Sequence, residues 1–177
     1  AMREGISRDG HRLYPAFPYT SFAGLTDTDL IDLYAHLMSQ TPVRQSTPAA
    51  EMRGLATWRP AMAVWNGLFH VAQPYEANPQ LTEAHNRGAY WVETAGHCGA
   101  CHTPRNMLGA EIQSQSLRGA MVEGWHAPAL DALNRSAVPW TEEAFYRYLR
   151  HGHSPWHRRS FAPVRALVAQ PSGAASA

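Results

Sequence analysis

Apolar residues recur at helical spacing in several parts of the chain, and polar or helix-breaking residues mark where each part ends. In the first part, Thr26 can cap a helix through its hydroxyl, Asp29 follows at the third position, and Pro42 lies beyond the end. Its apolar stripe consists of Leu30, Leu33, Tyr34, Leu37 and Met38. The predicted helices cover residues 26–38, 58–70, 82–95 and 141–152. The pattern predicts an all-α fold connected by long loops.

Proline-marked stretches separate these helices. Residues 41–57 carry Pro42 and Pro48 among small and polar residues, which is typical of a linker, and Pro74 and Pro79 mark a second stretch. The helix between them is predicted to pack between two structural units, because its apolar side is formed by Met62, Trp65, Leu68 and Phe69. The first helix follows a proline-broken loop, which offers its apolar face no partner.

Composition and charge exclude several classes of function. The chain of 177 residues has a formal net charge of +1 with acidic and basic residues mixed along it, so a nucleic acid is not an expected partner. No apolar run is long enough to cross a bilayer, and residues 1–5 do not begin a signal peptide. We therefore expect that a leader has been removed or that the N-terminus lies inside a longer protein.

The stretch Cys98-Gly99-Ala100-Cys101-His102 carries the candidate chemistry. Two thiols and an imidazole at this spacing are what covalent attachment of a c-type haem requires. Cys98 and Cys101 are placed to form thioethers with the haem vinyl groups, and His102 is predicted to be the proximal iron ligand through Nε2. The motif therefore predicts haem c as the cofactor.

Other uses of these residues are weaker. Both cysteines lie in the motif, so a disulfide framework is excluded, and a thiol redox pair would follow a strand, whereas residues 82–95 are typical of a helix. A zinc site would have to recruit histidines from elsewhere, such as His126 and the histidines after residue 150. Covalent haem attachment also implies export, which predicts a periplasmic protein.

Motifs in both halves resemble the multihaem cytochrome c subunits of bacterial membrane-bound dehydrogenases. In the N-terminal half they are Gly5-Ile6-Ser7-Arg8-Asp9-Gly10, Leu13-Tyr14-Pro15-Ala16-Phe17-Pro18-Tyr19 and Leu33-Tyr34-Ala35-His36-Leu37-Met38. In the C-terminal half they are Asn86-Arg87-Gly88-Ala89-Tyr90, the run from Gly96 to Asn106, and Gly124-Trp125-His126-Ala127-Pro128. The resemblance covers residues 2–45 and 80–157. Cytochromes of this kind serve quinoprotein alcohol dehydrogenases or molybdenum hydroxylases.

The resemblance implies a class I cytochrome c-like haem domain preceded by a truncated cytochrome c domain. Residues 1–45 would be the C-terminal remnant of that preceding domain, and 46–80 a linker with a packing helix. Residues 81–165 would be the domain with the CxxCH motif, and 166–177 a disordered tail. Because the core of the remnant is absent, we expect it to be the less stable part.

Three residues beyond the motif are candidates for haem binding. Pro104 follows His102 by two positions, where its carbonyl can accept a hydrogen bond from Nδ1 and fix the ligating tautomer. Arg105 can pair with a haem propionate or be a solvated loop residue. In this family Trp125 resembles a residue that lines the haem, with core burial as the alternative. Further residues expected in the haem pocket or core are Phe145, Tyr148 and Leu149.

The sixth iron ligand is where the sequence departs from the family. The family usually supplies a methionine from a loop well after the motif, whereas Phe161 stands at the aligned position and cannot ligate iron. From Arg158 onward the chain looks altered or truncated relative to the family. Met121 is one substitute, and the others are the loop histidines His151, His153 and His157. A vacant or water-occupied sixth position is the remaining alternative.

These observations predict an electron-transfer subunit that is not catalytic by itself. It would relay electrons from the catalytic subunit of a periplasmic dehydrogenase to a quinone or a terminal oxidase, in association with the cytoplasmic membrane. One alternative is a haem-based sensor or peroxidase-like site with an open distal position, which would bind carbon monoxide readily. Another is a truncated docking fragment without haem.

Overall fold

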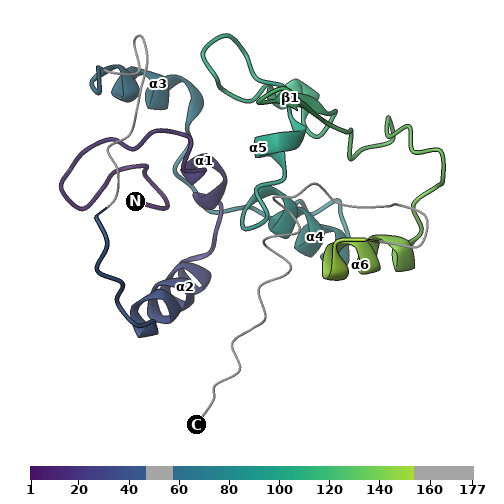
Figure 1. The fold of residues 1–177 in the computed structure, drawn as a ribbon, viewed down its shortest axis with the longest axis horizontal. Helices are drawn as coiled ribbons and strands as arrows, with labels where there is room; N and C mark the ends of the chain where they lie inside the picture. The colour runs from purple at the N-terminus through teal and green to yellow at the C-terminus, as the bar shows by residue number, and fades with distance from the viewer. Residues whose placement is uncertain (47–57, 154–177) are drawn as a thin grey trace. The chain divides into compact units, whose positions relative to one another are not determined.

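The computed structural model describes residues 1–46 and 58–153. Contacts group the chain into two compact units, which consist of residues 1–133 and of residues from 134 onward. The first unit contains α1 (Tyr19–Phe22), α2 (Asp27–Ser39), α3 (Ala61–Phe69), α4 (Glu83–Glu93), α5 (Gly99–His102), a short 3-10 helix (Gln113–Gln115), β1 (Ala120–Val122) and β2 (Trp125–Ala127). The second contains α6 (Glu142–His151). Figure 1 shows these elements along the chain.

The four predicted helices form close to their predicted bounds, and threonine side chains cap three of them, whereas α3 starts after Pro60. Thr26 Oγ1 accepts from the amide of Asp29 at 3.1 Å, and Thr82 and Thr141 accept in the same way at the starts of α4 and α6. Gly152 ends α6 in the left-handed conformation with φ 73°. The prediction of an all-α fold is corrected in one place. β1 and β2 form an antiparallel hairpin, which helical periodicity could not indicate because each strand has only three residues.

The core of the first unit lies where α1, α3 and the loop after the CxxCH motif meet. Tyr19, Trp65 and Ala110 are buried together, with Leu13, Met62 and Phe69 packed against them. Two hydrogen bonds fix this packing: Tyr19 Oη donates to Asn66 Oδ1 at 2.6 Å, and Trp65 Nε1 donates to the carbonyl of Leu108 at 2.9 Å. The helix predicted to pack between units thus binds the N-terminal segment and the motif loop into one core.

A second contact joins the N-terminal segment to α4. The hydroxyl of Tyr90 accepts from the amide of Thr26 at 3.1 Å and donates to the carboxylate of Asp29. This hydrogen bond is the main reason why the pKa of Asp29 lies below its ordinary value. The first unit therefore includes residues from the predicted remnant, from the predicted linker and from the predicted haem domain.

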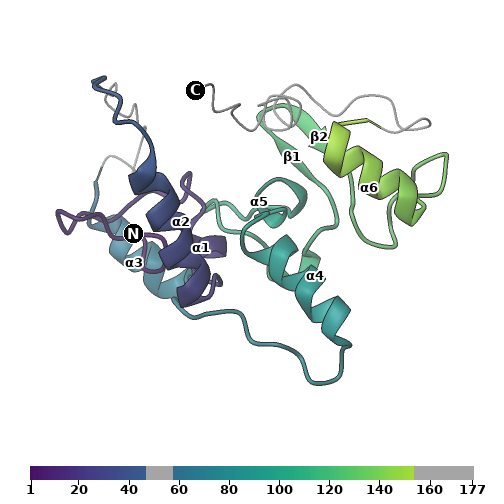
Figure 2. The ribbon, with the colours of Figure 1, turned by 90° about the horizontal axis from the view of Figure 1, so that it is seen from below.

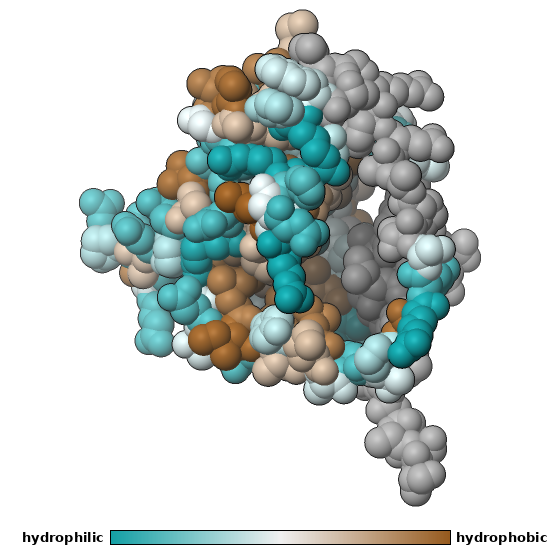
Figure 3. Space-filling view, turned by 90° about the vertical axis from the view of Figure 1, so that its left-hand side faces the viewer, coloured by the Kyte–Doolittle hydropathy of each residue, from teal (hydrophilic) through white to brown (hydrophobic). Residues whose placement is uncertain are grey.

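The apolar side of α2 is exposed at the surface. In the part of the chain that the structure describes, the stripe residues Tyr34, Leu37 and Met38 are 60–66% exposed, as is the adjacent Ile31. Leu33 is 37% exposed and Leu30 is half-buried. On this side of the molecule apolar residues lie at the surface in several patches (Figure 3). No helix within the described ranges is both long and apolar enough to cross a membrane.

Candidate functional site

A tight turn after α4 positions the CxxCH motif. The amide of Gly96 donates to the carbonyl of Trp91 at 2.8 Å, and the amide of Cys98 donates to the carbonyl of Val92 at 3.1 Å. His97 takes a left-handed φ of 39° to complete the turn. The chain is thereby folded back onto the end of α4, and α5 lies between α4 and the β1–β2 hairpin (Figure 2).

The motif residues occupy one helical turn. Cys98 is the N-cap of α5, and its carbonyl accepts from the amide of His102 at 3.0 Å. Because residues three and four positions apart lie on the same helix face, this turn gathers both thiols and the imidazole on one side. Both cysteines are free thiols, Cys98 half-buried and Cys101 exposed. Burial, and secondly the neighbouring Cys101, raise the pKa of the Cys98 thiol.

The imidazole of His102 is oriented by a backbone carbonyl. Nδ1 lies 2.7 Å from the carbonyl oxygen of Pro128. A carbonyl only accepts, so Nδ1 carries the proton and the lone pair of the neutral ring is on Nε2. The prediction for Pro104 is therefore wrong about this contact. The Pro104 carbonyl accepts instead from the amide of Ile112 at 2.8 Å, because the chain pairs Arg105 with Glu111 there.

The β1–β2 hairpin brings Pro128 to this position. Glu123 and Gly124 form its two-residue turn with φ of 49° and 84°, as a type I′ turn requires. The strands pair Ala120 with Ala127, so the chain enters and leaves the hairpin close to α5. At the entry, the amide of Gly119 donates to the carbonyl of His102 at 2.8 Å. The hairpin therefore holds His102 at two points, its main chain and its ring.

Gly119 makes this approach possible. Its φ is 86°, and a Cβ placed on it would lie 2.9 Å from both the carbonyl oxygen of Ala127 and the amide nitrogen of Ala129. These neighbours are backbone atoms, which cannot rotate away as a side chain can. Sequence reasoning missed both Gly119 and Pro128, although the stretch from Gly124 to Pro128 was among the motifs that indicated the family.

Arg105 holds the loop that follows the motif. Its guanidinium donates to the carbonyls of Gly109 at 2.7 Å and Ala100 at 3.0 Å, and it lies 3.7 Å from the carboxylate of Glu111. Buried Thr103 adds to this support, because its hydroxyl accepts from the amide of Leu117 at 3.0 Å. The side chain of Arg105 is 38% exposed, so it is a solvent-accessible loop residue that also holds the loop through these contacts.

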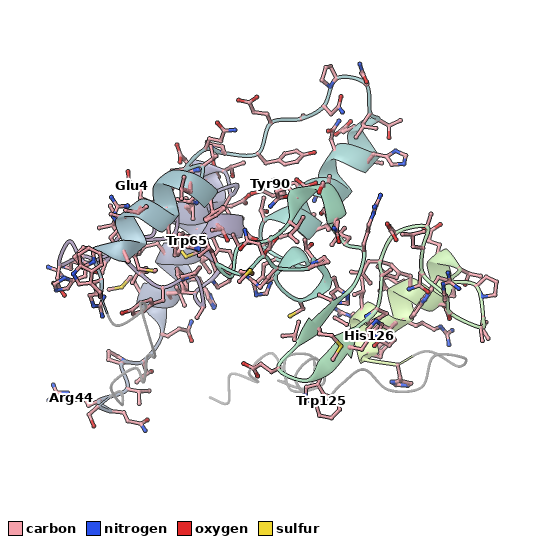
Figure 4. The ribbon with its side chains drawn as sticks, turned by 90° about the horizontal axis from the view of Figure 1, so that it is seen from above. Glu4, Arg44, Trp65, Tyr90, Trp125 and His126 are labelled. Atoms are coloured by element: carbon pink, nitrogen blue, oxygen red, sulfur yellow. The ribbon has the colours of Figure 1, made fainter. Side chains whose placement is uncertain are left out.

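Trp125 and the candidates for the sixth ligand belong to different elements of the chain. Trp125 projects outward from the hairpin and is 60% exposed, so core burial does not describe it (Figure 4). Met121 is exposed on β1, where it pairs with His126 of β2. His153 belongs to the second unit, where its Nδ1 lies 3.0 Å from the carbonyl of His151. Two further residues named from the sequence, His157 and Phe161, lie outside the described residues.

The α6 residues predicted for a haem pocket or core are only partly covered. Phe145 and Leu149 are 50% and 58% exposed in the structure as described. Trp140 contacts the rings of both Phe145 and Tyr148 edge to face, with centroids 6.0 and 5.2 Å apart. Within the second unit these side chains form an aromatic cluster on α6.

The donor set fits haem c. Cys98 and Cys101 would hold the porphyrin through thioethers, and Nε2 of His102 would bind the iron, because Nδ1 is already committed to Pro128. The Pro128 carbonyl fixes the tautomer that can ligate through Nε2. The arrangement is that of a candidate site for c-type haem attachment at the end of α4.

Comparisons with known proteins agree with this class. No family model matches the chain. A nicotinate dehydrogenase subunit of Pseudomonas putida is 53% identical over 171 residues, which are 96% of this chain and 14% of that protein. The fructose dehydrogenase cytochrome subunit of Gluconobacter japonicus is 35% identical over 171 residues, 95% of this chain and 35% of that protein. A diheme cytochrome c-type protein of Cereibacter sphaeroides is 31% identical over 156 residues, 88% of this chain and 52% of that protein.

The chain is homologous to cytochrome c subunits of bacterial dehydrogenases, which confirms the resemblance predicted from its motifs. It spans between 14% and 52% of the length of these three relatives. The substrates and partners in those names belong to the relatives.

Proposed function

We propose that this chain is the electron-transfer part of a cytochrome c subunit that carries one covalent haem c on Cys98 and Cys101. The observation that carries the proposal is the hydrogen bond from His102 Nδ1 to the Pro128 carbonyl, on the same helical turn as both thiols. This hydrogen bond supports iron ligation through Nε2, because it leaves the lone pair of that nitrogen free and would make the ring a stronger donor. Haem c supplies reversible one-electron chemistry when bound.

The residues of this chain serve to hold and tune that group. The thioether cysteines fix it at the end of α4, and Gly119 and Pro128 hold His102 from both ends of the hairpin. Arg105 keeps the following loop closed through the carbonyls of Ala100 and Gly109. Rigid support of this kind favours electron transfer, because little has to rearrange when the iron changes charge. The chain itself makes and breaks no substrate bond.

The likeness to dehydrogenase subunits supports a wider setting. We place the chain in the periplasm, in association with the cytoplasmic membrane, where it accepts electrons from a dehydrogenase catalytic subunit and passes them to a quinone or a terminal oxidase. The sixth iron ligand is part of the proposal: Met121, His153 and His157 are its candidates. A haem-based sensor or peroxidase is less well supported, since the relatives are cytochrome subunits.

Redox titration of the matured protein tests the proposed function. The chain is expressed together with a c-type haem maturation system, and its visible spectrum is followed while the ambient potential is changed. A single reversible one-electron transition is expected, and it should be absent from the double variant Cys98→Ala/Cys101→Ala, which cannot form thioethers. Carbon monoxide is then added to the ferrous protein. Strong binding would favour the sensor or peroxidase alternative, and a wild-type protein without haem would contradict the proposal altogether.

A further inference from the structure

The carboxylate of Glu111 lies against the CxxCH turn, and the attachment chemistry does not use it. A Cβ placed on Gly99 would lie 2.8 Å from Glu111 Oε2, so the carboxylate touches the backbone between the two cysteines. The side chain of Glu111 is 18% exposed. It is therefore mostly removed from water, yet open enough to exchange a proton with it.

The loop that carries Glu111 is held in place. Arg105 and Glu111 pair as an isolated antiparallel bridge, and the amide of Asn106 donates to the carbonyl of Ala110 at 2.8 Å. The side chain of Asn106 also accepts from the amides of Leu108 and Ala110, at 2.9 and 3.1 Å. The carboxylate thus has a fixed place against α5.

The charges that face Glu111 do not neutralise it fully. The guanidinium of Arg105 is 3.7 Å away, too far for a hydrogen bond, and it donates instead to the carbonyls of Ala100 and Gly109. His97, in the turn before the motif, is the other charged or titratable group that acts on the carboxylate. Burial outweighs the opposing effects of Arg105 and His97, so the pKa of Glu111 is raised above its ordinary value.

We infer that Glu111 is a redox-linked proton acceptor, whose carboxylate takes up one proton from solvent when the haem iron accepts one electron. The inference rests on the proposed function. An electron from the reduced partner lowers the positive charge at the iron, so the neighbouring carboxylate is less well stabilised and binds a proton. On oxidation the electron leaves to the acceptor and the proton returns to solvent. Charge is balanced in both directions, and no bond other than O–H forms or breaks.

The sign of the effect on the reduction potential follows. Where Glu111 is ionised in the ferric protein and protonated in the ferrous protein, the potential falls as the pH rises. Each tenfold difference in proton affinity between the two states corresponds to about 59 mV for a one-electron couple. Above and below that pH range the potential does not depend on Glu111.

The test measures the reduction potential against pH for the covalently loaded protein and its Glu111→Gln variant. The wild-type potential should fall through a defined pH range, and E111Q should lose that segment while keeping its thioether-bound haem. Glu123→Gln, which removes an exposed carboxylate at the hairpin turn, is the matched control and should behave as the wild type does. His97→Asn examines the other titratable neighbour, since asparagine tolerates the left-handed backbone there.

An unchanged pH dependence in E111Q would overturn the inference and assign the proton to another group, such as a haem propionate. Loss of the dependence in H97N alone would overturn it in favour of His97. If E111Q does not fold, redox-difference infrared spectroscopy of the wild type labelled with ¹³C-glutamate replaces it. A protonated carboxyl band must then appear on reduction, and its absence refutes the inference. A protein that carries no covalent haem would refute the proposed function instead. The same preparation shows whether haem is attached before any titration is made.

Discussion

Replacement of Gly119 by alanine examines how the hairpin holds the iron ligand. The added Cβ would lie 2.9 Å from Ala127 O and Ala129 N and 3.2 Å from the carbonyl carbon of Pro128. The φ of 86° costs a non-glycine residue about 1–2 kcal/mol, and overpacking against backbone adds about 1–3 kcal/mol. We expect the free energy of unfolding to fall by about 2–5 kcal/mol.

The same change should weaken the support of His102. Because the crowded atoms flank Pro128, relief of the contact moves the Pro128 carbonyl away from Nδ1 of His102. Nuclear magnetic resonance of the loaded ferrous protein follows the Nδ1 proton, which should exchange with solvent faster in G119A. Gly124→Ala is the control, since Gly124 has φ of 84° but nothing within 4 Å of its Cβ position. Equal losses of stability in both variants, with equal Nδ1–H exchange, would refute the reasoning.

Other predictions address single contacts. Tyr90→Phe should lower the free energy of unfolding most above the ordinary aspartate pKa of about 3.9, and the loss should become smaller as the pH falls through the depressed folded pKa of Asp29. Urea unfolding of both proteins at neutral and acid pH measures this loss, and a loss that does not depend on pH would contradict the prediction. Arg105→Lys should lower the free energy of unfolding by about 1 kcal/mol, because lysine cannot reach the carbonyls of both Ala100 and Gly109. The reduction potential of the haem should stay unchanged; a shifted potential with normal stability would favour a propionate contact. Amide exchange should be faster in α2 than in α4, since the apolar side of α2 is exposed; equal strong protection would contradict this.

The helices could be predicted because their signals are local. Thr26, Thr82 and Thr141 cap the helices that follow them, and Gly152 ends α6 as a left-handed residue. The core around Tyr19 was harder to predict, because it joins α1 and α3 to Ala110 across many residues. Apolar periodicity tells which face of a helix is buried and not what lies against it.

The candidate site was predictable in part for a similar reason. Cys98, Cys101 and His102 carry their chemistry in their spacing, so the attachment turn was visible in the sequence. The partner of His102 was not, because any carbonyl can accept its proton. Proximity along the chain favoured Pro104, whereas the hairpin brings Pro128 there from 26 residues away. Only the three-dimensional path of the chain distinguishes the two.

Mass spectrometry of the peptide that contains Cys98 to His102 tests the central claim most directly. The chain is matured in a host with c-type haem machinery, denatured and digested, so that only covalent attachment survives. We predict that this peptide carries the mass of one haem and that neither thiol reacts with an alkylating reagent. A peptide of unmodified mass with both thiols alkylated would contradict the account.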